Sequence, residues 1–272
     1  MPQGSFMWER SGATCKTAEV SGACEPEIVT LQRTLYNSRN PTRRWLHLFR
    51  RAQVCGLIEK SSPPSRSLAL EVGPGSGVYL PPLCASFEHV TAIDIEPAHM
   101  KSIQGRMQFD NLTVLVGDFL KMKWEHPFDL ILCSEVIEHV DDPSALVQAI
   151  SRALRPRGLL IMSTPQRWSL MELTCRIGLS APLIRFVRSI YQEPVFPTGH
   201  INLMSRRTLV SLLSRNGFSV VHSEVFGLYI PVLAEFGGTF GAKLAKKLQP
   251  VLQRSPFSFL LWTQLHLARR VN

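Results

Sequence analysis

Blocks of apolar and polar residues alternate from residue 41 to residue 165 in a helix–strand rhythm. Apolar residues at helical spacing predict helices at 41–60, 76–86, 97–108 and 143–154. Continuous apolar runs predict buried strands at 68–72, 89–95, 112–116, 128–133 and 159–163. Strands that are apolar throughout and alternate with helices predict an α/β fold, in which helices cover both faces of a mostly parallel sheet.

The second half of the chain is less regular. Two stretches, 166–199 and 226–255, read as irregular insertions. Between them the pattern predicts a helix at 205–215 and a strand at 218–225. The tail, 257–270, is predicted to form a final strand.

We expect one domain over residues 41–272, preceded by a polar lead-in over residues 1–40. The first residues contain no apolar segment of the kind found in signal peptides, and no apolar run reaches the roughly 18 residues of a membrane span. None of the six cysteines forms a CxxC pair, which favours a reducing compartment over a zinc or redox motif. We therefore expect a cytoplasmic protein.

The formal charge of +9 adds a question about partners. An excess of this size suits an acidic partner such as nucleic acid, anionic lipid or a phosphorylated substrate, but a solvated basic surface explains it equally well. The basic residues are scattered from Arg43 to Arg270 and form no long run or RNA-binding signature. A nucleic-acid partner is therefore not favoured.

A glycine-rich loop follows the first predicted strand, with Glu71 at the strand end and then Gly73, Gly75 and Gly77. Glycine lets the backbone approach a ligand closely, and the free N–H groups at the start of the next helix can bind polar groups. The GxGxG spacing differs from the GxGxxG of nicotinamide-binding loops. By itself the loop fits either a ligand site or a tight strand-to-helix turn.

Acidic residues end two further strands. Asp94 closes the second strand, where a carboxylate can accept hydrogen bonds from two ligand hydroxyls, and Asp118 follows the third strand, next to Phe119. The carboxyl ends of parallel strands lie at one edge of the sheet, which is where open α/β folds bind their ligands. These residues and the glycine loop together predict one ligand site along that edge.

The segments LEVGPGSG, AIDIEP, VGDF, FDLILCSEVIEHVDDP and LRPRGLLIMSTP occur in this order, and together they resemble the class I S-adenosylmethionine (SAM)-dependent methyltransferases. The resemblance is strongest to the small-molecule branch that includes the ubiquinone-biosynthesis O-methyltransferases. It implies a Rossmann-like sheet of seven strands, mostly parallel, with helices on both faces and an antiparallel last strand inserted between strands five and six. It also implies methyl transfer from SAM to a small or lipid-like acceptor, at an oxygen atom.

The resemblance assigns roles along the predicted edge. Glu71 and the three glycines would face the methionine part of SAM, Asp94 would hold the ribose, and Asp118 and Phe119 the adenine. The set of expected cofactor-binding residues is completed by Ile95 and Glu135.

Glu135, Glu138 and His139 follow the fourth strand at spacings that share one face of a helical turn. With His200 as a fourth ligand they could hold a divalent ion such as Mg²⁺, which would activate and orient an acceptor hydroxyl. The arrangement resembles the metal sites of the ubiquinone-pathway enzymes and of the small-RNA 2′-O-methyltransferases. Alternatively, His139 acts as a general base, or the cluster only forms hydrogen bonds at the SAM pocket.

The insertions leave other functions open. Arginines among the apolar residues of 166–199, and Lys243, Lys246 and Lys247 in the second insertion, are compatible with an acceptor lid, a peripheral membrane contact or a helix packed on its own domain. Three other functions are considered: an RNA 2′-O-methyltransferase, a nicotinamide dehydrogenase and a non-catalytic SAM-binding scaffold. The GxGxG spacing disfavours the dehydrogenase.

Overall fold

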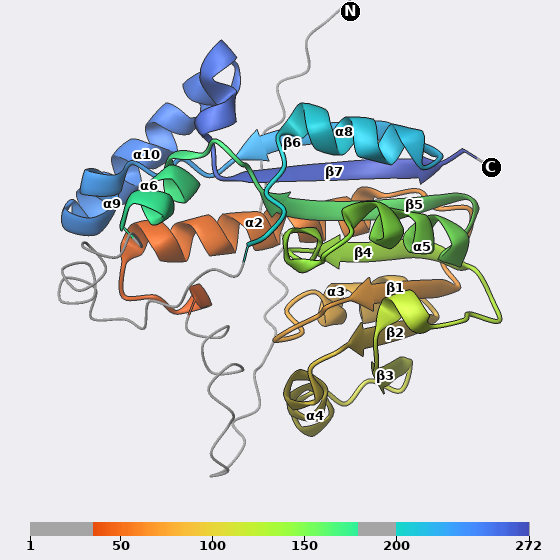
Figure 1. Ribbon diagram of the computed structural model, residues 1–272. Helices are drawn as coiled ribbons and strands as arrows, with labels where there is room; N and C mark the ends of the chain where they lie inside the picture. Colours follow the sequence, from red (N-terminus) through yellow and green to blue (C-terminus); the bar gives the residue numbers. More distant parts are fainter. Residues whose placement is uncertain (1–34, 179–199, 272) are drawn as a thin grey trace, which may run out of the picture.

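The structure is a computed structural model that describes residues 35–178 and 200–271 (Figure 1). The strands are β1 (Leu68–Val72), β2 (His89–Asp94), β3 (Leu112–Val116), β4 (Phe128–Ser134), β5 (Leu154–Pro165), β6 (Phe218–Phe226) and β7 (Thr263–Arg270). The α-helices are α2 (Pro41–Lys60), α3 (Leu80–Ser86), α4 (Pro97–Arg106), α5 (Pro143–Ala153), α6 (Leu170–Gly178), α8 (Arg206–Arg215), α9 (Pro231–Phe236) and α10 (Gly238–Gln253). Three 3₁₀ turns, η1 (Phe119–Lys121), η2 (Ile137–His139) and η3 (Pro256–Leu260), complete the described elements.

All seven strands form one sheet in the order β3-β2-β1-β4-β5-β7-β6. Strand β7 runs antiparallel to its neighbours β5 and β6, and the other pairs are parallel. The predicted α/β class is confirmed, and so is the antiparallel last strand between the fifth and sixth strands. Because β1, β2 and β4 are neighbours and parallel, their carboxyl ends lie side by side at one edge.

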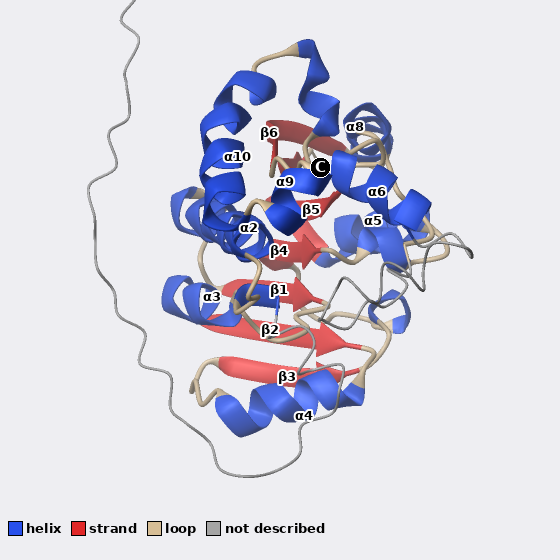
Figure 2. Ribbon diagram, turned by 90° about the vertical axis from the view of Figure 1, so that its left-hand side faces the viewer, coloured by secondary structure: helices blue, strands red, loops and turns tan. Residues whose placement is uncertain are grey.

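Helices cover both faces of the sheet (Figure 2). On one face, α2, α3 and α4 bury apolar side chains such as Ile58, Leu83 and Ile103 against β1 and β2. On the other, α5 and α8 pack residues such as Ile150 and Leu213 against β4 and β5. The sheet is therefore apolar on both sides, as its continuous apolar strands require.

Helix α2 has the predicted bounds, and local chemistry explains where it begins. The side chain of Asn40 accepts hydrogen bonds from the backbone N–H groups of Thr42 and Arg43, and Pro41 occupies the first turn. Its buried stripe includes not only Val54 and Ile58 but also the polar side chains of His47 and Arg50.

Between residues 41 and 165, two predicted boundaries were wrong by four or more residues. The helix predicted at 76–86 begins only at Leu80, because Gly75 and Gly77 adopt positive φ and keep the chain in turns up to Tyr79. The segment 155–158, taken as a turn before the fifth strand, belongs to β5, which pairs from Leu154 onwards across an irregularity in the β4 register.

The stretch 226–255 is helical rather than irregular. Its glycines suggest breaks in regular structure, but they allow α9 and α10 to pack closely: a Cβ on Gly241 would lie 2.1 Å from the carbonyl oxygen of Leu233. The tail 257–270 also differs from its prediction, because η3 fills its first part and β7 begins only at Thr263.

Residues 1–34, most of the lead-in, and residues 179–199, most of the first insertion, lie outside the described residues. Of the first insertion, 166–199, only residues 166–178 with helix α6 are described, so the lid and membrane-contact interpretations of its remaining arginines and apolar residues lie outside the described structure. Among the helices of residues 35–178 and 200–271, none combines the length and the apolar character needed to cross a bilayer.

Candidate active site

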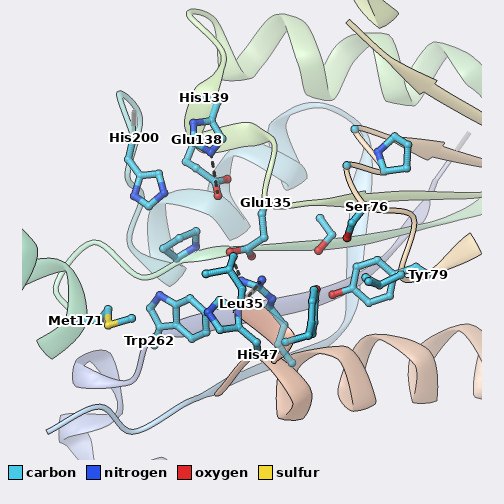
Figure 3. A pocket seen from close by; sticks show the side chains of 18 of the residues that line it. Leu35, His47, Ser76, Tyr79, Glu135, Glu138, His139, Met171, His200 and Trp262 are labelled. Atoms are coloured by element: carbon cyan, nitrogen blue, oxygen red, sulfur yellow. Dashed lines mark hydrogen bonds and ion pairs between the residues drawn. The ribbon is translucent and has the colours of Figure 1, made fainter. Parts of the chain in front are cut away.

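A cavity of about 340 Å³ lies at the carboxyl edge of the sheet. Its walls come from the loops after β1 and β4, from helices α2 and α6, and from residues next to β7. Figure 3 shows Glu138, His139 and His200 on one side of this cavity and Trp262, His47 and Met171 on another. The cavity thus brings together segments far apart in the sequence.

The glycine loop after β1 forms part of the wall. Gly73, Gly75 and Gly77 have φ values of 66°, 54° and 76°. Residues other than glycine adopt this backbone region only at a cost in free energy. A Cβ on Gly73 would lie only 2.5 Å from Cγ2 of Val136, in the loop after β4. Glycine at this position therefore lets the two loops approach each other at the cavity.

Glu71 lies at the end of β1 and lines the same cavity. Burial, with a further contribution from the nearby charge of Asp94, raises the pKa of Glu71 to about 8. Its Oε2 atom is buried and has no hydrogen-bond partner among the described residues. A buried carboxyl group without a partner suits a cationic ligand group, which would favour its ionised form.

Asp94 ends β2, with one oxygen close to the glycine loop. Its Oδ1 accepts a hydrogen bond from the backbone of Glu96 at 2.9 Å, and its Oδ2 lies 3.1 Å from Nδ1 of His99 and 3.4 Å from the backbone nitrogen of Gly75. Burial alone would raise the pKa of Asp94, but these hydrogen bonds outweigh it and hold the pKa below its ordinary value. The side chain is therefore an oriented, ionised acceptor.

The residues expected near adenine follow β2 and β3. Ile95 is 71% exposed, so its apolar surface is available to a flat ligand. Asp118 accepts a hydrogen bond from the backbone of Leu120 and pairs with Lys121, whereas Phe119 is buried and packs near Trp124. At Phe119, only the backbone is therefore suited to contact a ligand.

Glu135 stands at the end of β4 with a φ of 58°, a strained value for a residue other than glycine. Both carboxylate oxygens have partners: Arg50 donates to Oε2, and the hydroxyl of Ser163 donates to Oε1 at 2.9 Å. Burial would lower the pKa of Arg50, but the charge of Glu135 raises it above its ordinary value. Glu135 is thus held by α2 and β5.

Ligand atoms of Glu138, His139 and His200 lie within 4.8 Å of one another. Oε2 of Glu138 accepts a hydrogen bond from Thr164 at 2.8 Å, whereas Oε1 has no hydrogen-bond partner in the described part of the chain and lies 3.9 Å from Nε2 of His139. Nδ1 of His200 lies 3.3 Å from Glu172, which fixes the orientation of that ring. Of the four expected metal ligands, these three come together, while Glu135 lies outside the group.

The wall supplied by α2 and by Trp262, which precedes β7, was not predicted. The guanidinium carbon of Arg50 lies 4.8 Å from the ring centroid of Trp262, and the ring of His47 meets that of Trp262 edge to face at 5.0 Å. Burial, and then the charge of Arg50, hold the pKa of His47 well below its ordinary value, so the imidazole is neutral. The available signal was a polar pair at helical spacing inside the apolar stripe of α2.

A family model described as a methyltransferase domain matches residues 45–223. Over 115 residues, 40% of this chain and 46% of the relative, the chain is 37% identical to a ubiquinone biosynthesis O-methyltransferase of Xylella fastidiosa. A protein of the same name from Histophilus somni is 31% identical over 146 residues, which are 49% of this chain and 57% of that relative. The matches thus span about half the length of these curated relatives.

Solved structures share the fold at low sequence identity. The N-methyltransferase NodS from Bradyrhizobium japonicum, in complex with S-adenosyl-L-homocysteine, gives a TM-score of 0.54 at 18% identity, over 90% of this chain and 98% of that one. The magnesium protoporphyrin IX methyltransferase of Synechocystis, also with bound S-adenosylhomocysteine, gives 0.54 at 14% identity, over 89% and 93%. With the family match across most of the sheet, these findings show that the chain belongs to the class I SAM-dependent methyltransferases.

Proposed function

We propose that this protein transfers the methyl group of SAM to an oxygen atom of a small or lipid-like acceptor. The observation that carries the proposal is the shared cavity, which is lined both by the glycine loop with Glu71 and by Glu138, His139 and His200. Methyl transfer from a sulfonium depends chiefly on holding donor and acceptor close together and in line. A single cavity with a donor side and an acceptor side meets this need.

In this proposal SAM lies along the carboxyl edge of the sheet. Its ammonium group is placed near Glu71, whose buried oxygen has no other hydrogen-bond partner among the described residues. Asp94 and Ile95 hold the ribose and adjoining adenine, and Asp118 with the backbone of Phe119 binds the adenine edge. Gly73, Gly75 and Gly77 let the backbone contact the methionine part, and Glu135 borders the transferred methyl group.

We further propose that Glu138, His139 and His200 hold a divalent metal ion. The fit rests on Oε1 of buried Glu138, which has no hydrogen-bond partner among the described residues, and on the orientation of His200 by Glu172, which leaves Nε2 of that ring for a ligand bond. Two imidazoles and one carboxylate suit Mn²⁺ or Fe²⁺ better than Mg²⁺, which prefers oxygen ligands. The ion would supply a Lewis acid for an acceptor hydroxyl; without it, His139 is the candidate general base.

The opposite wall favours an acceptor with an apolar or aromatic body. Trp262, Met171 and the neutral ring of His47 offer apolar and aromatic surface, and the curated relatives act, by their names, in ubiquinone biosynthesis.

The catalytic domain in this proposal is residues 41–272. Its proposed location is the cytoplasm, where the free Cys55, Cys84, Cys133 and Cys175 would stay reduced.

The test is transfer of label from methyl-radiolabelled SAM by the full chain into a fractionated cell extract, with Mn²⁺ or Mg²⁺ and with EDTA. We expect label in the organic phase, and loss of transfer with EDTA or in His200→Ala. The matched control is His222→Ala, which removes a half-exposed histidine on β6 and is expected to leave transfer unchanged. Label confined to RNA would replace the acceptor class with a nucleic acid, and transfer unaffected by EDTA would refute the metal.

Failure of S-adenosylhomocysteine to bind would instead favour a non-catalytic scaffold. Binding is measured by calorimetry before any transfer assay, so that an inactive preparation and a wrong acceptor are told apart.

A further inference from the structure

Helices α9 and α10 and the turn η3 carry an unusual number of exposed apolar side chains. Val232, Phe236, Phe240 and Val251 are each about 70% exposed, and Phe257 and Phe259 are 58% and 43% exposed. Exposed apolar groups that occur singly are ordinary, but a group of large ones in consecutive elements marks a contact surface. The six residues all belong to the connection between β6 and β7.

Basic residues are interspersed among them on α10. Phe240, Lys243, Lys247 and Val251 follow one another at spacings of three or four residues, so they share one face of the helix, which continues to Arg254 at its end. All five are exposed, while the opposite face, with Ala242, Ala245 and Gln249, is buried against the domain. We call Val232, Phe236, Phe240, Lys243, Lys247, Val251, Arg254, Phe257 and Phe259 the apolar-basic surface.

Negative charge is missing from this region. From residue 236 to the end of the chain the sequence contains no aspartate or glutamate. The last acid before it, Glu235, pairs with Arg43 at 2.8 Å and accepts a hydrogen bond from Tyr229. Within the described part of the chain, Lys243, Lys247 and Arg254 form no salt bridge, so their positive charge stands beside the phenylalanines without an acidic partner there.

The apolar-basic surface lies at the same end of the molecule as the cavity. In Figures 1 and 2, α9 and α10 lie with α6 beyond the carboxyl ends of the parallel strands. Helix α6 supplies Met171 and Cys175 to the cavity wall, and α9 is tied to the start of α2 through Asn40, which donates to the backbone of Ala234. A flat partner resting on this surface would lie close to the cavity.

We propose that the apolar-basic surface docks the protein on an anionic lipid bilayer. Phenylalanine side chains enter the boundary between head groups and acyl chains, while Lys243, Lys247 and Arg254 meet anionic head groups, which is the pattern of interfacial rather than spanning helices. Charge complementarity favours an anionic bilayer over a second copy of this chain, because two copies would bring like charges together. Docking does not depend on methyl transfer or on the acceptor.

The experiment is co-sedimentation of the full chain with vesicles of equimolar phosphatidylcholine and phosphatidylglycerol, and with vesicles of phosphatidylcholine alone. We expect binding to the anionic vesicles that weakens as salt is added. Phe236→Ser with Phe240→Ser should weaken it at least about tenfold, because two large apolar side chains no longer leave water on docking. Lys243→Gln with Lys247→Gln should also weaken it about tenfold or more, because each lost charge removes attraction to the anionic head groups.

Matched variants elsewhere control for apolarity and charge. Val221→Ser with Val271→Ser removes exposed apolar groups, and Lys101→Gln with Arg207→Gln removes two exposed charges, away from this surface. Both pairs should bind vesicles like the unaltered chain, and all variants should still bind S-adenosylhomocysteine, which separates this test from that of methyl transfer. Equal binding to both vesicle types, equal losses in the controls, or a dimer that dissociates on Phe236→Ser with Phe240→Ser would overturn the proposal.

Discussion

Arg50, within helix α2, donates a hydrogen bond from its guanidinium to the carboxylate of Glu135, 85 positions later at the end of β4. The pair lies beside the cavity, where Arg50 also stacks over Trp262. Glu135 has positive φ, a conformation that persists only where surrounding contacts enforce it. The helix that precedes the first strand therefore helps to fix the backbone next to the proposed methyl-transfer site.

Removing the arginine should be costly. In Arg50→Met the carboxylate of Glu135 keeps the hydrogen bond from Ser163 but loses its charged partner in a largely buried place, and we expect a loss of about 3 kcal/mol in the free energy of unfolding. Adding Glu135→Gln to Arg50→Met should restore part of the lost stability, because the double variant leaves no unpaired charge. Urea unfolding measures both. Arg44→Met, an exposed site on the same helix, should change stability by less than about 0.5 kcal/mol, and an equally small effect at Arg50 would contradict the role given to the pair.

Ligand binding should depend on pH through Glu71. Its pKa of about 8 in the free protein means that the carboxyl is protonated at neutral pH, whereas a bound ammonium group favours the ionised form. S-adenosylhomocysteine should therefore bind more tightly as pH rises towards 8, by up to about tenfold per unit, with release of a proton. Calorimetry in buffers of different ionisation enthalpy measures that proton.

The Glu71→Gln variant should bind S-adenosylhomocysteine more weakly and without this pH dependence. The Glu88→Gln variant, changed at an exposed position, should keep the affinity and the pH dependence of the unaltered protein. A pH-independent affinity in the unaltered protein would show that Glu71 does not contact the ammonium group.

The sequence predicted those parts of the fold and the candidate site that depend on local pattern. Strands β1 and β3 have the expected bounds, because apolar runs that end at glycine or an acid define a strand and its carboxyl end together. The placement of Glu71 and Asp94 at one edge followed from the parallel order alone.

Long-range packing could not be predicted in this way. A partner of Glu135 comes from α2, and nothing local signals that contact; paired with Arg50, Glu135 lies outside the group formed by Glu138, His139 and His200. The glycines of 237–241 also misled, because they suggest an irregular stretch by composition but allow close packing of α9 on α10.

Gly73 should tolerate no side chain. In Gly73→Ala the new Cβ would meet Val136 at 2.5 Å and the residue would keep a positive φ, so we expect a cost of about 1–3 kcal/mol in stability and at least about tenfold weaker binding of S-adenosylhomocysteine. Thermal unfolding and calorimetry test this. Gly105→Ala in α4, where nothing lies within 4 Å of a Cβ, should be neutral or slightly stabilising. Adding Val136→Ala to Gly73→Ala should recover only part of the loss, because the φ strain remains.

Acid should weaken the fold through His266, which lies fully buried on β7. Burial, followed by the charges of Arg206 and His222, lowers its pKa to about 4, and its Nδ1 has no hydrogen-bond partner among the described residues. Because the unfolded chain takes up a proton near pH 6.5 and the folded chain does not, the free energy of unfolding should fall between pH 6.5 and 4 by up to about 3 kcal/mol. His266→Gln should flatten this slope, with a remainder from His47, whose pKa is also lowered. His89→Gln, at an exposed position on β2, should leave the slope unchanged, and an unaltered slope in His266→Gln would mean that His266 is already accessible to protons in the folded protein.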